Sequence, residues 1–462
     1  MPAEDIALAD MQGLIRSAFS TLKFAFYVLL HIEDRLQAHQ WLAQLIDEGP
    51  ITHSVLDKKN ELNHVINIAF THSGLKNMGL DDASLLTFSR PFVEGMSDSL
   101  RAQALGDDPF QWEWGNPGNK ESLDIVLLVF ARTQELLDEK RRMFEGMCRG
   151  GGVKMLRILE TTEWSGREHF GFKDGLSQPV IRGMDKDEEK ATTQPGEIVL
   201  GYPDHYGYVD YNPLVPGVSD TGSFLLPPSK EDQKRGAAPE SRMFGRNGSY
   251  LVIRQLEQDV AHFWRFARRA AITNGESTER FAAKLIGRWP EKGAPLVISP
   301  DFEDPDQSEK NDFSYADDPN GMKCPFGAHI RRGNPRDMLA PLKTDQHRIL
   351  RRGRSYGPAI SDKFEDDGQR RGLFFICLNS DLERQFELIQ QSWVNNRFFN
   401  GLSCEVDPIS HIQDNKVLTL PTDPLRRQVV RLNYEEPFVT VKGGAYFFMP
   451  GISALRYLAA LR

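Results

Sequence analysis

The first third of the chain alternates between short apolar runs and longer segments with helical spacing. Four apolar runs have the length and composition of buried strands, and they are residues 24–30, 63–71, 124–130 and 153–159. Helices are predicted at residues 35–46 and 133–147, and residues 83–96 have a helical composition that Pro91 interrupts. The resulting order, β-α-β-(α)-β-α-β, predicts a ferredoxin-like unit, in which helices cover one face of an antiparallel sheet.

The same pattern returns in the second half of the chain, with long irregular stretches between its elements. Strands are predicted at residues 250–256, 373–378 and 445–449, and helices at 259–271 and 380–394. The chain is therefore expected to be an α+β protein of two ferredoxin-like domains, each an antiparallel sheet covered by helices. We place the N-terminal domain at residues 1–225 and the C-terminal domain at 226–462, with the Pro-, Gly- and Tyr-rich residues 201–230 as the candidate connection.

Composition narrows the class of protein without identifying it. A length of 462 residues favours two domains, and 40% apolar with 26% charged residues is typical of a globular protein. The net charge of −9 disfavours nucleic acid or an anionic membrane as a general partner. No apolar run is long enough for a transmembrane helix. The four cysteines form no Cys-x-x-Cys pair, which argues against both a structural zinc site and a disulfide framework.

The N-terminus has no basic region ahead of an apolar run, so no secretory signal is evident. We therefore expect a cytoplasmic protein. The alternative is a secreted protein whose signal is absent from this chain.

A loop in the middle of the chain places a carboxylate between two glycines. Asp174 lies between Gly171 and Gly175, and Pro179 stiffens the segment that follows. Glycine at these positions permits positive φ and lets a flat partner approach the main chain closely. Asp174 could form an ordinary Asx turn, or it could serve as a catalytic acid.

Two later segments carry a candidate metal ligand and a candidate catalytic cation. The first is residues 324–332, CPFGAHIRR, which contains His329, and the second is residues 350–358, LRRGRSYGP, which contains Arg351 and Arg352. His329 alone could be a satisfied core or surface histidine. No His-x-x-x-His pair exists, and a single histidine with an open opposite face suits haem iron better than zinc.

Together the three segments resemble the signature of the dye-decolourising peroxidases, a family of haem enzymes. Its members carry a Gly-x-x-Asp-Gly loop followed much later by a proximal histidine and a distal arginine, and the resemblance extends from residues 10–13 to residues 443–450. The resemblance implies haem b in the C-terminal domain. It also implies reduction of hydrogen peroxide and oxidation of dyes and phenolic or other aromatic donors through a ferryl intermediate.

The resemblance assigns a role to each residue of the trio. His329 is similar to the axial ligand of the haem iron, Asp174 to the distal acid and Arg351 to the distal arginine, with Arg352 as a direct competitor. Asp407 is similar to the acid that accepts a hydrogen bond from the axial histidine, and Glu405 is the alternative.

Three apolar residues of the second half also match positions in this family. Leu373 and Phe375 match residues that roof the distal pocket. Trp393 is similar to a surface tryptophan proposed to carry electrons from bulky donors, whereas its helical spacing after Phe386 and Ile389 equally suits a packing aromatic.

Two other functions stay open from the sequence. One is a haem-binding or haem-handling protein on the same fold without significant turnover. The other is a haem-free hydrolase that uses Asp174 with a histidine. The sequence does not decide whether the chain forms a homo-oligomer.

Overall fold

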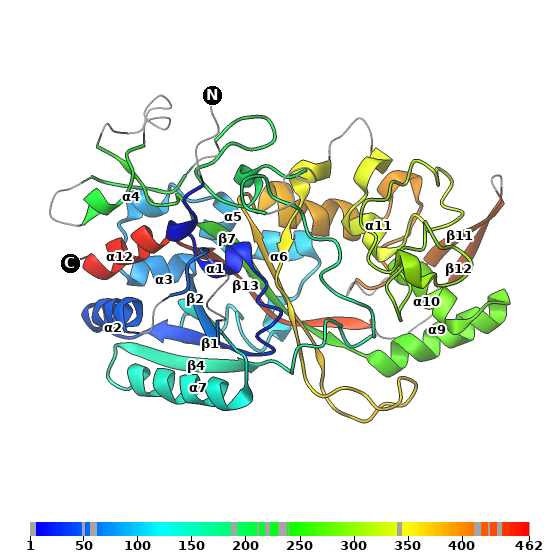
Figure 1. Cartoon of the computed structure of the whole chain (residues 1–462), viewed down its shortest axis with the longest axis horizontal. Helices are drawn as coiled ribbons and strands as arrows, with labels where there is room; N and C mark the ends of the chain where they lie inside the picture. The colour runs from blue at the N-terminus through cyan, green and yellow to red at the C-terminus, as the bar shows by residue number, and fades with distance from the viewer. Residues whose placement is uncertain are drawn as a thin grey trace.

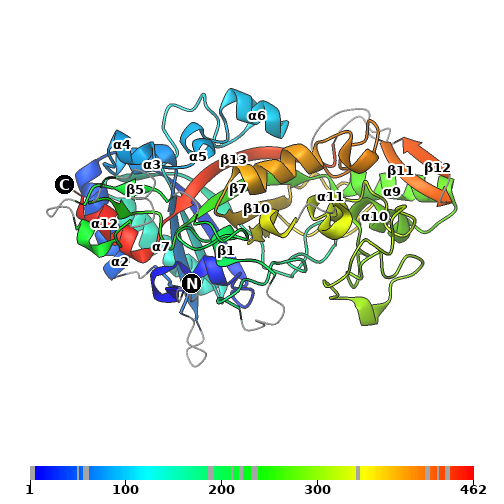
Figure 2. The same ribbon diagram turned by 90° about the horizontal axis from the view of Figure 1, so that it is seen from above.

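One antiparallel sheet runs through the molecule from end to end. The computed structural model describes residues 6–48, 51–55, 62–185, 192–209, 212–217, 222–229, 238, 240–339, 344–410, 417–423, 426–431 and 437–461. Nine strands form the sheet in the order β4-β1-β3-β2-β13-β7-β10-β8, with β9 paired to β10 (Figure 1). Figure 2 shows β13 crossing between the two halves of the molecule.

The four strands predicted in the first third are confirmed. They are β1 (Phe24–Ile32), β2 (His64–Phe70), β3 (Ile125–Ala131) and β4 (Val153–Glu160). All their pairings are antiparallel, in the ferredoxin-like order β4-β1-β3-β2. The flanking helices α2 (Arg35–Asp47) and α7 (Gln134–Cys148) also match the prediction.

Both faces of this half-sheet are buried, although we expected helices on one face only. Along β1, Phe26, Val28 and Leu30 point into a core with the helices, because side chains alternate between faces. Tyr27 and Leu29 point into a second core. That core is closed by α1 (Gly13–Arg16) and by irregular chain, which has no periodicity that a sequence pattern could reveal.

The second half repeats the same strand order. Its strands are β7 (Ser249–Gln258), β8 (Leu350–Arg351), β9 (Arg354–Tyr356), β10 (Gly372–Asn379) and β13 (Val439–Met449). The order β13-β7-β10-β8 again places the last strand beside the first. The sequence did not predict β8 and β9, because two or three residues are too few to show a period.

The two halves share one sheet, which corrects the expectation of two separate sheets. The join is made where Phe448 of β13 pairs with Phe70 of β2. The C-terminal helix α12 (Ile452–Ala460) also packs beside α2 of the first half (Figure 1). The domain boundary at residue 225 stays a prediction, and part of the candidate connection at 201–230 lies outside the described residues.

The helices of the second half stand around the far end of the sheet. The helix predicted at 259–271 is confirmed as α9 (Val260–Asn274), which packs against α10 (Thr278–Ile286). The helix predicted at 380–394 forms as two π-helical segments, η9 (Glu383–Glu387) and η10 (Ile389–Val394).

Short elements complete the architecture: α3 (His72–Asn77), α4 (Asp82–Leu85), α5 (Arg90–Glu94), α6 (Ser99–Leu105), α11 (His329–Gly333), β5 (Leu214–Val215), β6 (Arg242–Met243), β11 (Val417–Asp423) and β12 (Arg426–Arg431). The segment 83–96, expected to be helical but interrupted at Pro91, forms the two short helices α4 and α5, and Pro91 lies in the first turn of α5.

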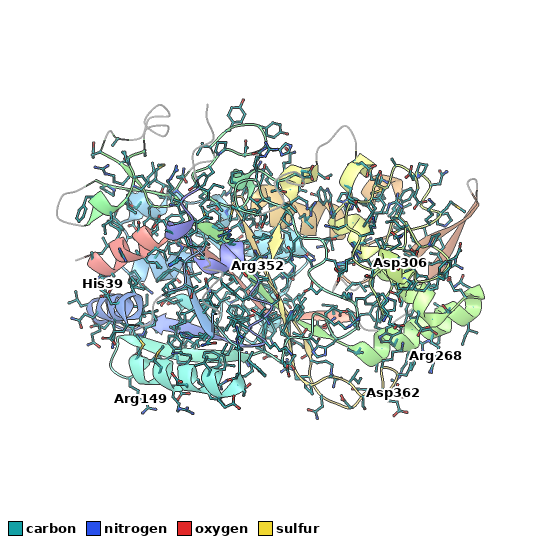
Figure 3. The ribbon with its side chains drawn as sticks, in the orientation of Figure 1. His39, Arg149, Arg268, Asp306, Arg352 and Asp362 are labelled. Carbon is teal, nitrogen blue, oxygen red and sulfur yellow. The ribbon has the colours of Figure 1, made fainter. Side chains whose placement is uncertain are left out.

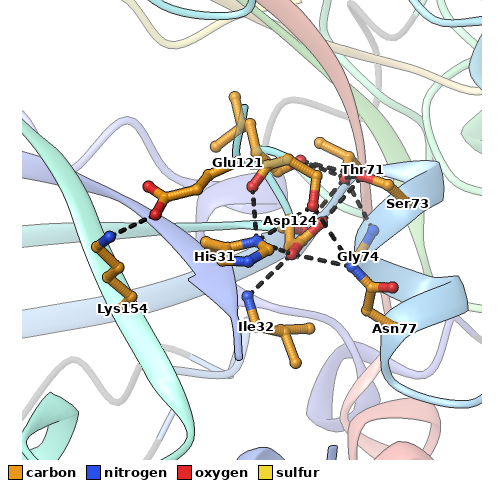
Figure 4. Close-up of polar contacts among 11 residues, drawn as sticks. His31, Ile32, Thr71, Ser73, Gly74, Asn77, Glu121, Asp124 and Lys154 are labelled. Atoms are coloured by element: carbon orange, nitrogen blue, oxygen red, sulfur yellow. Dashed lines mark hydrogen bonds and ion pairs between the residues drawn. The ribbon is translucent and has the colours of Figure 1, made fainter. Parts of the chain in front are cut away.

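A buried carboxylate ties the first half together (Figure 4). Asp124 is fully buried and accepts hydrogen bonds from the backbone N–H of Ile32 at 2.9 Å and from the Ser73 hydroxyl at 2.9 Å. The Asn77 amide donates to it at 3.1 Å, and His31 Nδ1 lies 2.9 Å away. These contacts join the end of β1 to α3, so this histidine and aspartate have a structural role.

Among the helices in the described part of the chain, none combines the length and the apolar character needed to cross a membrane.

Candidate functional site

The three segments singled out in the sequence meet at one cavity of about 320 Å³ in the second half of the molecule. Its wall contains every residue predicted for the site. They are Asp174, His329, Arg351, Leu373, Phe375, Trp393 and Asp407. Residues that lie up to 233 positions apart in the sequence therefore face a common space.

The loop that carries Asp174 has the backbone geometry expected from its glycines. Gly171 has φ +99° and Gly175 has φ +86°, both in the region that favours glycine. The Asp174 backbone N–H donates to the carbonyl of Gly166 at 3.0 Å, and its carboxylate accepts from the Gly175 N–H at 2.6 Å. The turn thus holds the carboxylate at the cavity wall.

Arg351 is the partner of this carboxylate. Its Nη1 donates to Asp174 Oδ1 at 2.8 Å. The side chain of Gln178 fixes the backbone of Arg351 through two hydrogen bonds, both of 3.0 Å. The Gln178 side-chain oxygen accepts from the Arg351 N–H, and the Gln178 side-chain NH2 donates to the Arg351 carbonyl. One amide side chain therefore binds β8 to the loop and sets the register that brings the two charged groups together.

Arg352, the competing candidate, is not among the residues that line this cavity. Its Nε donates to the carbonyl of Leu14 at 2.8 Å, and its Nη2 donates to the carbonyl of Ile15 at 3.0 Å. Figure 3 shows Arg352 near the middle of the molecule. Arg351 ends β8 and lines the cavity, whereas Arg352, the next residue, does not line it.

His329 begins α11 and faces the cavity with one nitrogen occupied. Its Nδ1 lies 2.9 Å from Oδ2 of the buried Asp407, whose other oxygen accepts from the backbone N–H groups of Ile409 at 2.8 Å and Ser410 at 3.1 Å. This arrangement fixes the ring and leaves Nε2 as the nitrogen available to a metal. Glu405, the alternative acid, accepts instead from the Thr419 N–H at 3.0 Å.

The pKa values of this pair move in opposite directions. Burial lowers the pKa of His329, but the charge and hydrogen bond of Asp407 outweigh burial, so the pKa is raised overall. Burial raises the pKa of Asp407, but the charge and hydrogen bond of His329 outweigh it, so that pKa is lowered. The pair therefore favours an ionised carboxylate beside the imidazole.

Leu373 and Phe375 lie on β10, two residues apart, and both face the cavity. The intervening Phe374 and the following Ile376 point into the core on the other side of the sheet. The strand thus supplies an apolar wall to a cavity whose neighbouring wall carries Asp174 and Arg351.

Trp393 is buried, which decides the question of its exposure that the sequence left open. Its relative exposure is 8%, and it lines the cavity with Phe386 and Ile389. Positions three and four apart share a helix face, and here that face covers the cavity. The ring contacts His347 edge-on, with a centroid distance of 5.5 Å. Its role in electron transfer stays a prediction.

Sequence reasoning missed Glu168, a half-buried acid in the same loop as Asp174. Its two oxygens accept from the backbone N–H groups of Phe170 and Phe172, each at 2.8 Å, and from the Gln258 amide at 2.6 Å. Burial raises the pKa of Glu168 to about 7, although these hydrogen bonds oppose the rise. Its position six residues before Asp174 was the only signal available in the sequence.

Three further arginines line the cavity and bind backbone carbonyls. Arg288 donates to Gly293, Arg336 to Asn311 and Arg348 to Ser177. Burial, with repulsion from neighbouring arginines, lowers the pKa of both Arg288 and Arg348 to about 10. A cavity wall with this excess of positive charge suits a ligand that carries carboxylates.

Comparison with known proteins supports the resemblance over most of the chain. Residues 10–161 match the family described as the DyP dimeric alpha+beta barrel domain, and residues 227–399 match the Dyp-type peroxidase C-terminal family. The protein belongs to the dye-decolourising peroxidase family.

Several dye-decolourising peroxidases align with most of the chain. A dye-decolorizing peroxidase of Mycena epipterygia is 30% identical over 88% of this chain and 78% of its own. The multifunctional dye peroxidase DyP2 of an Amycolatopsis species is 33% identical over 88% of this chain and 86% of its own. A solved dye-decolorizing peroxidase in complex with 2,6-dimethoxyphenol superposes with a TM-score of 0.78 at 26% identity, covering 98% of this chain and 100% of its own.

A member with a different name matches a smaller part of the chain. The deferrochelatase of Yersinia pestis is 30% identical over 46% of this chain and 35% of its own.

Proposed function

We propose that this protein is a haem-dependent peroxidase that reduces hydrogen peroxide and oxidises dyes and phenolic or other aromatic donors. The observation that carries the proposal is that the Asp174–Arg351 pair and the His329–Asp407 pair line the same cavity. One pair can move a proton and stabilise negative charge, and the other can hold a metal.

The residues of the cavity suit haem b. His329 Nε2 would bind the iron, and the buried Arg288 with the half-buried Arg336 and Arg348 would neutralise the porphyrin carboxylates. Leu373 and Phe375 would contact the ring plane. Bound haem would supply the iron that binds peroxide and the store for its two oxidising equivalents.

Asp174 and Arg351 would have different roles in cleavage of the O–O bond. Asp174 would accept a proton from one oxygen of hydrogen peroxide and return it to the other oxygen, which leaves as water. Arg351 donates hydrogen bonds to the leaving oxygen as negative charge develops there. The apolar side chains of Leu373 and Phe375 would lower the local dielectric constant beside a bound ligand, which would strengthen both interactions.

Asp407 acts through His329. Its carboxylate orients the imidazole and increases electron donation from Nε2. Stronger electron donation from the imidazole would assist cleavage of the O–O bond when haem is bound.

An absorption spectrum tests the proposal directly. The purified protein should show a Soret band, one equivalent of hydrogen peroxide should change it, and an anthraquinone dye should then be consumed only when peroxide is present. Protein without a Soret band after loading with haem would exclude the proposal.

A second candidate is a haem-handling protein without significant turnover, which the match to a deferrochelatase over 46% of the chain favours. The same measurement separates the two. A haem-handling protein would show the Soret band but would consume no dye.

A further inference from the structure

A buried tyrosine beside the cavity is hydrogen-bonded to a carboxylate. Tyr446 lies on β13, is 3% exposed and donates its phenolic O–H to Glu387 Oε1 at 2.8 Å. The second oxygen of Glu387 accepts from Arg101 Nη1 at 2.7 Å. Two other buried tyrosines have different partners: Tyr202 donates to the Asn247 amide oxygen, and the hydroxyl of Tyr250 accepts from a backbone N–H.

Aromatic rings connect this tyrosine to the cavity. The Tyr446 ring meets Phe386 edge-on with a centroid distance of 6.0 Å, and Phe386 lies 6.2 Å from Phe375. Both phenylalanines line the cavity. Glu387 directly follows Phe386 on η9, so the carboxylate and the ring contact come from the same π-helical segment. Such segments are frequent at functional sites.

Loss of an electron from a phenol requires that its proton leave at the same time, since a protonated phenol radical is a very strong acid. A general base must therefore lie within hydrogen-bond reach. Burial raises the pKa of Glu387, although its bonds to Tyr446 and Arg101 oppose the rise, which makes its carboxylate a better base than an exposed one. Burial and Glu387 both raise the pKa of Tyr446, so the phenol stays protonated until it is oxidised.

We propose that Tyr446 is a one-electron donor to the cavity and that Glu387 is its proton acceptor. The inference rests on the proposed peroxidase function, which supplies the oxidant. Tyr446 gives one electron to the cavity, where one of the two oxidising equivalents from peroxide is reduced, and its O–H proton moves to Glu387 Oε1. An aromatic donor later returns an electron to Tyr446, and Glu387 returns the proton.

Electron paramagnetic resonance of the haem-loaded protein tests this assignment. One equivalent of hydrogen peroxide, without a reducing substrate, should produce a tyrosyl signal that narrows when the tyrosines carry ring deuterium. Tyr446→Phe should lose this signal. Tyr250→Phe, the matched control for a buried tyrosine hydroxyl without a carboxylate partner, should keep it. Glu387→Gln should also lose the signal although the phenol remains, because an amide accepts a hydrogen bond but not the proton.

The outcomes separate the two hypotheses. An unchanged tyrosyl signal in Tyr446→Phe, or in Glu387→Gln if Tyr446→Phe fails to fold, overturns the assignment alone. Peroxide that leaves the haem spectrum of the wild-type protein unchanged overturns the proposed function, and the assignment falls with it. A purely structural role for Tyr446 would lower the thermal stability of the variant and leave the radical in place.

Discussion

The Arg351 guanidinium lies 2.8 Å from the Asp174 carboxylate, although 177 positions separate the two residues in the sequence. The contact depends on β8 pairing with β10, on the glycines of the Asp174 loop and on the clamp that Gln178 forms with the Arg351 backbone. The fold itself therefore holds the pair in place, which is the pre-organisation that electrostatic catalysis needs.

Removal of the carboxylate should slow the reaction with peroxide. Asp174→Asn keeps the size of the side chain but cannot accept a proton, so we expect a loss of ~10²–10⁴-fold in the second-order rate constant. Stopped-flow absorbance measures this rate, with haem content as the check on folding. Asp362→Asn on an exposed loop is the control (Figure 3). An undiminished rate would remove Asp174 from the mechanism.

The neighbouring arginines should separate catalysis from stability. Arg351→Leu should slow the reaction with peroxide by roughly 10²–10³-fold with little change in the free energy of unfolding. Arg352→Leu leaves the buried carbonyls of Leu14 and Ile15 without their donor, so it should lower the free energy of unfolding by about 2 kcal/mol or more. Peroxide kinetics and urea unfolding of both variants give the comparison. The reverse pattern would mean that Arg352 is the catalytic cation.

Retention of haem should depend on His329 and, less strongly, on Asp407. His329→Ala removes the proposed iron ligand and should abolish stable retention during gel filtration. Asp407→Asn loses the ionised acceptor of the Nδ1 hydrogen bond and should weaken haem binding by roughly 10–100-fold. Haem content and the position of the Soret band measure both effects. Unchanged values in His329→Ala would contradict the ligand assignment.

Trp393→Phe should affect bulky donors more than small ones. The substitution keeps most of the packing in the cavity wall, so the reaction with peroxide and the oxidation of small phenols should stay close to wild type. Turnover of an anthraquinone dye should fall if the indole carries electrons outward. Equal losses on both classes of donor would indicate a packing defect, and no loss on either would exclude the role.

Glu168 should make the stability of the haem-free protein depend on pH. Its folded pKa of about 7 lies above the ordinary value of 4.5, so the folded state holds the proton more tightly than the unfolded chain. The contribution to stability is complete below pH 4.5 and is lost as the pH rises to about 7, with an upper limit of ~3 kcal/mol.

Urea unfolding between pH 4.5 and about 7 measures how the free energy of unfolding changes as Glu168 loses its proton. Glu168→Gln should flatten this part of the curve, whereas Glu139→Gln on the exposed face of α7 should leave the slope unchanged. Identical slopes for Glu168→Gln and the wild type would show that Glu168 does not titrate in this range.

The local pattern of the chain was sufficient for most of the secondary structure and for the candidate residues. The long strands of both halves follow from apolar runs and from alternation along the chain, because those patterns depend on which side of an element meets the core, whereas β8 and β9 are too short to show either pattern. The loop around Asp174 could be predicted as well, since the need for positive φ at Gly171 and Gly175 is a property of the backbone itself.

Long-range contacts settled what these patterns leave open. The choice between Arg351 and Arg352 depends on which face of β8 meets the Asp174 loop, and neither segment contains that information. Trp393 shares its spacing with any packing residue, because a helix face that lines a cavity and one that packs against a core are equally apolar. The two half-sheets become one sheet because β2 pairs with β13, at Phe70 and Phe448. These residues lie near opposite ends of the chain, so the pairing leaves no local pattern in the sequence.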